Sequence, residues 1–143
     1  MNEIKIVIDK YLKNKIDNST LIQMYYEVGC IIKDNDLNLT ELELFLKHTY
    51  GLVIAFTKRN LLNMVKLSNQ DTNTISKLKK ITWKNCLVLL NGHLDLIGLV
   101  IEYNPTKQEL LNYIKENKIF VKNEFLEHDD TLEEMIELSK MYD

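Results

Sequence analysis

The chain has 143 residues, of which 18 are Lys or Arg and 21 are Asp or Glu, so its formal net charge is −3 at neutral pH. This length fits one globular domain, and a content of 45% apolar residues excludes a largely disordered chain. Four Gly and one Pro exclude collagen-like and most turn-rich all-β architectures, and no apolar run reaches the roughly 20 residues of a membrane helix.

Helical periodicity dominates the sequence from end to end. Apolar residues recur three and four positions apart, which is the spacing of one helix face. Residues 94–103 are ambiguous, because their apolar run fits a buried strand or a buried helix. We expect a helix there, since no nearby segment offers a strand partner. The predicted helices cover residues 4–16, 21–32, 40–50, 57–68, 75–78, 82–90, 94–103, 106–118 and 131–140.

Local signals predict where several of these helices begin and end. Asp17 and Thr57 precede helical patterns and are expected N-caps, and Gly51 is an expected C-cap. Three Thr–Glu pairs have the three-residue spacing of a capping box: Thr40 with Glu43, Thr106 with Glu109, and Thr131 with Glu134. We therefore expect an all-α, compact multi-helix domain spanning residues 1–143, with an acidic C-terminal helix within 124–143.

Charge is distributed unevenly along the chain. Residues 51–92, called the basic block below, hold seven basic residues and only Asp71 as an acid, a net charge of +6. Residues 93–143 hold five lysines and twelve acids, a net charge of −7. A basic block between acidic flanks favours either a local anion-binding face or an ordinary solvated lysine surface.

The middle of the chain has the outline of a helix-turn-helix: two short helices and a tight turn, with a basic, Thr-capped second helix. Three blocks are also similar to one family: residues 24–29 (Met-Tyr-Tyr-Glu-Val-Gly), residues 56–64 (Phe-Thr-Lys-Arg-Asn-Leu-Leu-Asn-Met) and residues 81–83 (Ile-Thr-Trp). In order and spacing they resemble the N-terminal domain of the YhcG-type nucleases, bacterial and mobile-element proteins, over about residues 20–119.

This resemblance implies a helical, helix-turn-helix-like domain that binds DNA or mediates assembly. Two departures stand out: Tyr26 replaces the usual Trp, and Lys84-Asn85 replaces a Ser-His pair after the tryptophan. Because only 24 residues follow position 119, we expect no counterpart of the family's PD-(D/E)xK nuclease domain and do not carry over its activity.

The predicted DNA-binding residues lie in the basic block. Arg59 is the only arginine and hence the one candidate for two-bond recognition of guanine, while Asn60 or Asn63 could read adenine. Lysines would neutralise phosphates. A structural role for Arg59, paired with a carboxylate of the acidic half, is the alternative, and the family resemblance implies a structural role for both Arg59 and Asn60. The full predicted set is Lys58, Arg59, Asn60, Asn63, Lys66, Lys77, Lys79, Lys80 and Lys84.

Other candidate chemistry is weaker. Trp83 is expected to be a core anchor rather than a base-stacking residue. Asp34, Asp36 and Asn38 resemble the start of a calcium loop, but Leu39 replaces its glycine.

No catalytic or metal site is expected elsewhere. His48, His93 and His128 have no second metal ligand at a helical spacing. Asp95 with Glu116 and Lys118 has the letters of a PD-(D/E)xK site, but Glu116 falls at a helix end. The acids between Asp129 and Glu137 are expected to cap and solvate their helix. We expect no catalytic residue, metal or cofactor.

The sequence therefore favours a non-enzymatic DNA-binding or accessory protein of a bacterial mobile-element or defence system. The alternative is a protein-interaction module whose acidic C-terminal half binds a basic partner such as a nuclease and inhibits or assembles it. A homodimer is expected of a helix-turn-helix reader. The start of the sequence does not resemble a signal peptide. The two cysteines, Cys30 and Cys86, lie far apart and are expected to be buried reduced thiols. Both features predict a cytoplasmic protein.

Overall fold

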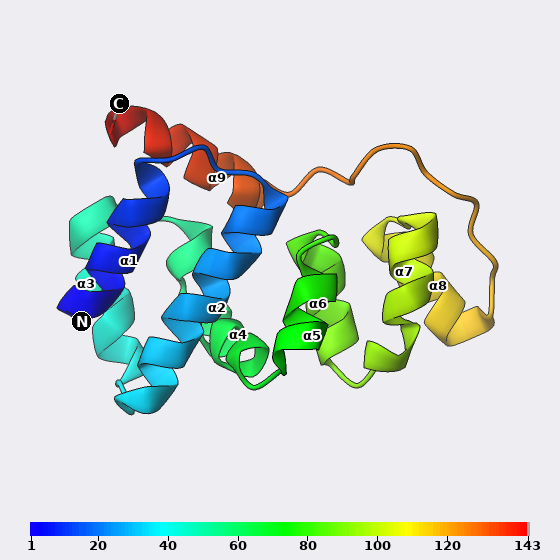
Figure 1. Cartoon of the computed structure of the whole chain (residues 1–143), viewed down its shortest axis with the longest axis horizontal. Helices are drawn as coiled ribbons and strands as arrows, with labels where there is room; N and C mark the ends of the chain where they lie inside the picture. Colours follow the sequence, from blue (N-terminus) through cyan, green and yellow to red (C-terminus); the bar gives the residue numbers. More distant parts are fainter. Residues whose placement is uncertain (143) are drawn as a thin grey trace.

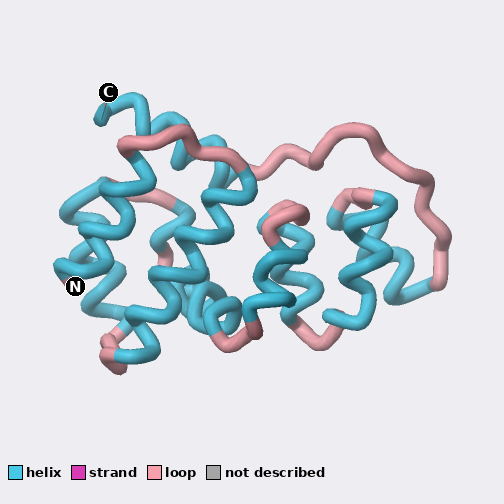
Figure 2. Tube along the Cα trace, in the orientation of Figure 1, coloured by secondary structure: helices cyan, strands magenta, loops and turns pink. Residues whose placement is uncertain are grey.

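The computed structural model describes residues 1–142, which form helices and connecting loops without a β-strand (Figure 2). The predicted all-α fold is confirmed. Within this range no helix combines the length and apolar character needed to cross a bilayer. The α-helices are α1 (Asn2–Leu12), α2 (Asn18–Asp34), α3 (Leu39–Tyr50), α4 (Lys58–Ser68), α5 (Thr72–Leu78), α6 (Trp83–Leu90), α7 (Ile97–Tyr103), α8 (Lys107–Glu116) and α9 (Asp130–Ser139). Three 3-10 turns accompany them: η1 (Ile54–Phe56), η2 (Leu94–Leu96) and η3 (Lys140–Tyr142).

The helices form two groups that share one hydrophobic core. Figure 1 shows α1 to α4 on one side and α5 to α8 on the other, with a long loop that leads from α8 back to α9 over the first group. Buried apolar residues from α1 through α9 belong to a single cluster. The C-terminal helix therefore completes the core built by the first four helices.

Helices α2 and α4 pack unusually closely, and Gly29 makes this possible. A Cβ atom at Gly29 would lie 2.0 Å from the carbonyl oxygen of Met64. One turn further along both helices, the Lys33 ammonium donates to the carbonyl oxygen of Ser68 at 3.3 Å. These contacts hold α4 against α2 at the centre of the fold.

Most of the predicted helix signals are confirmed. Residues 94–103 are helical, as η2 and α7. Asp17 accepts from the backbone N–H of Thr20, and Thr106 and Glu109 form a reciprocal capping box. Gly51 ends α3 with a φ of 86°, a left-handed conformation that glycine adopts without strain.

Two predicted capping boxes are wrong. Asn38, not Thr40, is the N-cap of α3, because its side chain accepts from the backbone N–H of Glu41 at 3.0 Å. Asp129, not Thr131, is the N-cap of α9, so the predicted acidic helix begins at Asp130. Residue 143, the last of that predicted segment, lies outside the described residues.

Helices α3 and α4 make up the helix pair expected of a helix-turn-helix-like core. Their connection is residues 51–57, which includes η1 and is longer than the expected tight turn. Thr57 caps α4, as predicted, and accepts from the backbone N–H of Asn60. The basic, Thr-capped helix therefore exists, and its surroundings decide what it can bind.

Candidate binding groove

A groove of about 670 Å³ lies between α4, α6 and α8. The residues that α4 contributes recur every three or four positions, so they share one face of that helix. Leu62 and Leu111 are 46% and 37% exposed, which leaves the groove open to a ligand. Its apolar lining consists of Ile54, Leu62, Leu87, Val88, Leu90, Leu111 and Ile114.

The charged residues that line the groove are all basic. Arg59 and Lys66 project from α4 and Lys107 from the start of α8, and all three are exposed. None of them forms an ion pair with a carboxylate in the described part of the chain, and no Asp or Glu lines the groove. The groove therefore combines an apolar interior with a positive edge whose three cations make no ion pair among the described residues.

The groove contains some of the predicted DNA-binding residues and not others. Arg59, Asn60, Asn63 and Lys66 line it, whereas the remaining predicted lysines do not. Lys58 is exposed, and its backbone N–H donates to the Glu43 carboxylate. The predicted DNA-binding residues outside the groove are Lys58, Lys77, Lys79, Lys80 and Lys84.

Little of the basic block is neutralised by the fold. Lys84 makes the one ion pair of its seven basic residues within residues 1–142, to Glu127 at 4.0 Å. Lys77 and Lys80 are exposed, and Lys79 is half-buried. The structural alternative for Arg59, pairing with an acid of the C-terminal half, therefore has no counterpart among the ion pairs of the described residues.

Asn60 has the structural role and not the base-reading role. It is 7% exposed. Its amide Nδ2 donates to the carbonyl oxygen of Ala55 at 2.7 Å, and its Oδ1 accepts from the indole Nε1 of Trp83 at 2.8 Å. Both ends of the amide are occupied inside the protein, so Asn60 cannot make the two-bond contact to adenine. Asn63 is the asparagine of α4 that remains half-exposed in the groove.

Tyr25, Asn60 and Trp83 meet in the core. The rings of Tyr25 and Trp83 lie 4.8 Å apart, and both side chains are at most 2% exposed, as expected for a core anchor at Trp83. Burial also raises the pKa of the Tyr25 hydroxyl well above its usual range. These residues come from the three sequence blocks on which the family resemblance rests, so in this structure the blocks hold α2, α4 and α6 together.

The acids of the C-terminal third bind backbone N–H groups far away in the sequence. Glu134 accepts from the backbone N–H groups of Ile54 at 2.9 Å and Ala55 at 3.1 Å. Asp129 accepts from that of Trp83 at 3.2 Å, and Glu127 from that of Lys107 at 2.9 Å. Three of the acids therefore stabilise the starts of η1, α6 and α8, a role that nothing in their local sequence indicates.

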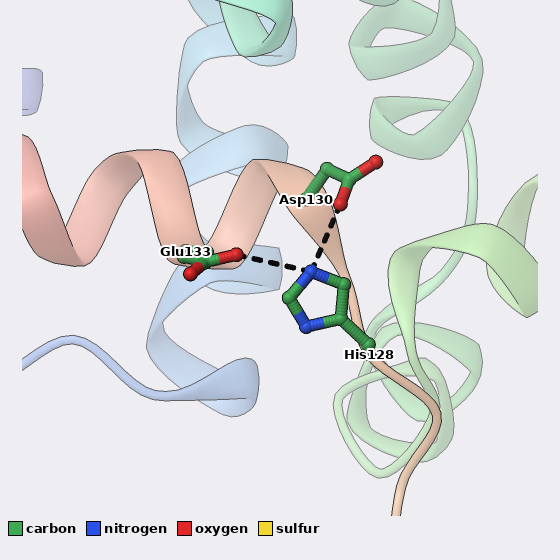
Figure 3. A group of neighbouring side chains, drawn as sticks. All are labelled: His128, Asp130 and Glu133. Carbon is green, nitrogen blue, oxygen red and sulfur yellow. Dashed lines mark ion pairs between the residues drawn. The ribbon is translucent and has the colours of Figure 1, made fainter.

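A histidine and two carboxylates gather at the start of α9 (Figure 3). The Nε2 of His128 lies 2.9 Å from Asp130 and 3.0 Å from Glu133. The sequence does not predict this group, because the spacing His128-x-Asp130-x-x-Glu133 is not one of the usual metal-ligand spacings. All three residues are exposed, and the positive end of the α9 dipole accounts for the two acids at this position, because it attracts carboxylates.

The remaining candidates are structural. Asn38 caps α3, and Glu116 ends α8 and pairs with Lys118 at 3.0 Å. A PD-(D/E)xK site needs its Glu and Lys on a strand, and residues 1–142 contain none. Cys86 is buried, which raises the pKa of its thiol, whereas Cys30 is only half-buried, contrary to expectation.

No protein-family model matches this chain, and no curated protein or solved structure matches it either. The resemblance to the YhcG-type N-terminal domain therefore stays a prediction from three sequence blocks.

Proposed function

We propose that this protein is a non-enzymatic DNA-binding module that holds the phosphate backbone with the cations of its basic block. The observation that carries the proposal is that these cations are not cancelled: Lys84 alone among them pairs with a described carboxylate. Unpaired cations attract phosphates, and releasing the counterions of DNA supplies most of the binding free energy in such complexes.

Contacts to phosphate fit the geometry better than readout of bases. Asn60 is hydrogen-bonded inside the protein. The outer face of α4 lines a groove beside α6 and α8 instead of standing free to enter a major groove. Phosphate contacts position a protein without specifying a sequence, so we expect binding with little sequence preference.

The family resemblance supports the same function and suggests its setting, an accessory role in a bacterial mobile-element or defence system. Catalysis is not part of the proposal. The letters of the nuclease signature fall on η2 and at the end of α8, where Glu116 pairs with Lys118.

Fluorescence anisotropy with a labelled random DNA duplex at 50 to 200 mM salt tests this function. We expect binding that weakens as salt rises and disappears in the double variant Lys58→Glu/Arg59→Glu. The matched control is Lys13→Glu/Lys122→Glu, which makes the same charge change at two exposed lysines outside the basic block. An absence of binding at low salt, or equal binding by both variants, contradicts the proposal.

The alternative from the sequence is a partner docked on the acidic half. Glu127, Asp129 and Glu134 of that half are engaged internally. Its exposed acids are Asp130, Glu133 and Glu137 on α9 and Asp95, Glu102, Glu116 and Glu124 elsewhere. If the protein does not bind DNA at low salt, this acidic face becomes the leading candidate.

A further inference from the structure

We propose that the groove between α4, α6 and α8 is a docking site for an acidic amphipathic helix of another protein. This function goes beyond DNA binding and does not depend on it. The proposal rests on the apolar lining of the groove, on the sign of the charges at its edge, and on the spacing of those charges.

The apolar lining needs an apolar ligand. Leu62 on α4 and Leu111 on α8 expose large parts of their side chains toward the groove, and Leu87 and Leu90 of α6 lie between the two helices. Apolar area that becomes buried against a ligand contributes roughly 25 cal/mol per Å². Phosphates would leave this surface in water, whereas leucine or isoleucine side chains of a partner would cover it.

The lining also argues against single-stranded nucleic acid as the occupant of the groove. Proteins that bind single strands present aromatic side chains on which the bases stack. No Phe, Tyr or Trp of the described residues lines this groove. An aliphatic floor with cations at its edge instead resembles the helix-in-groove mode, in which apolar anchors recur at i, i+3, i+4 and i+7.

The charges select an acidic helix. Arg59 and Lys66 stand seven residues apart on α4, about 10 Å along the helix axis. Lys107 lies on the opposite wall. A second helix laid in the groove repeats its own faces every seven residues, so two glutamates seven positions apart can face Arg59 and Lys66 while leucines between them point inward. A basic helix would meet like charges on both walls.

The occupant and DNA would compete, because Arg59 and Lys66 belong to both surfaces. An acidic helix seated in the groove neutralises two of the cations that we assign to phosphate contacts. A protein partner could in this way switch DNA binding off without any change in the fold.

The test uses the whole chain and a fluorescein-labelled 18-residue peptide built from Leu, Ala and Glu. Its leucines follow the i, i+3, i+4, i+7 pattern, and its glutamates are seven positions apart on both flanks. We expect saturable binding in the absence of DNA. Binding should weaken at least tenfold in Leu62→Ser/Leu111→Ser and at least fivefold in Arg59→Gln/Lys66→Gln.

The matched control is Ile6→Ser/Leu44→Ser, which removes two leucine-sized side chains that are 68% and 56% exposed on α1 and α3. It should bind the peptide as the native chain does. A peptide with Lys in place of every Glu should not bind. Circular dichroism verifies that each variant folds, and amide chemical shifts that change along α4, α6 and α8 locate the peptide independently of any variant.

Three results would overturn the proposal: no binding at 1 mM peptide, equal binding by the groove and control variants, or shift changes elsewhere. Sedimentation of the native chain without peptide tests whether a second copy occupies the groove instead. If the native chain is a dimer and Leu62→Ser/Leu111→Ser is a monomer, the occupant is a second copy and not another protein. Since no nucleic acid is present, a failure here is distinct from a failure of DNA binding.

Discussion

The indole nitrogen of Trp83 donates to the side-chain oxygen of Asn60 across 2.8 Å in the buried centre of the protein. The same Asn60 amide donates to Ala55 just before α4, so one side chain ties the start of α4 to the start of α6. Of the two roles that the sequence left open for Asn60, base reading and structure, the structural one therefore applies, and this residue joins the two halves of the fold.

Asn60→Ala is expected to lower the free energy of unfolding by about 2 to 4 kcal/mol, because it leaves the Trp83 N–H and the Ala55 carbonyl without partners inside the core. Urea unfolding followed by the fluorescence of Trp83, the single tryptophan, measures the effect. Asn63→Ala, on the same helix but half-exposed, should change stability by less than about 0.5 kcal/mol. An Asn60→Ala protein as stable as the native chain would refute this role.

Gly29→Ala is expected to destabilise the protein by about 2 kcal/mol or more, since the added methyl group would overlap the backbone of Met64 and force α2 and α4 apart. Gly98 provides the control, because a Cβ there meets nothing within 4 Å. In helix α7, Gly98→Ala should be neutral or stabilise by about 0.5 to 1 kcal/mol. Thermal unfolding of both variants gives the comparison, and equal effects would contradict the close packing.

Glu134→Ala is expected to cost about 1 to 3 kcal/mol, because the backbone N–H groups of Ile54 and Ala55 lose their acceptor. Glu137→Ala, one turn further along α9 at an exposed position, should cost less than about 0.5 kcal/mol. Chemical denaturation distinguishes the two. If both variants unfold at the native denaturant concentration, the acids of α9 do not anchor η1.

The stability contributed by Glu109 should depend on pH in the acid range. The backbone N–H of Thr106 and then the amide of Asn123 hold the pKa of Glu109 below its ordinary value of 4.5. A group with a lowered pKa contributes stability above its unfolded pKa, and this is lost as pH falls through its folded pKa.

Glu109→Gln should therefore be less stable than the native chain at pH 7, by about 0.5 to 1 kcal/mol, and the difference should shrink below pH 4.5. Urea unfolding at pH 7, 5, 4 and 3 measures it, with the exposed Glu102→Gln as the charge-matched control. A difference that stays constant or grows toward acid pH would show that the carboxylate is not the stabilising form.

The helices could be predicted from the sequence because their signals are local. The apolar spacing of residues 94–103 and the capping box of Thr106 and Glu109 depend only on neighbours within one or two turns. Thr40 and Thr131 misled because a better acceptor, Asn38 or Asp129, stands two residues earlier. A capping box is identified by the spacing of two residues, and this spacing does not show which of two nearby side chains accepts from the first backbone N–H groups of the helix.

The functional surface could be predicted only in part, because long-range contacts leave no local pattern. Asn60 looks like an exposed first-turn residue until Trp83, 23 positions later, supplies its partner. Glu134 binds a backbone segment 80 positions away. The groove likewise depends on how α8 is placed beside α4. The sequence therefore predicted the cations of α4 but not that leucines of α6 and α8 line the same groove.

The salt dependence of DNA binding tests most directly whether the basic block meets phosphates. With four to six contacts, log K should fall against log salt with a slope of about −4 to −5. Replacing Lys77, Lys79 and Lys80 together by Gln should make the slope shallower by about 2 to 3, while Gln at Lys13, Lys115 and Lys122 should leave it unchanged. Equal slopes for the two triple variants would contradict the account.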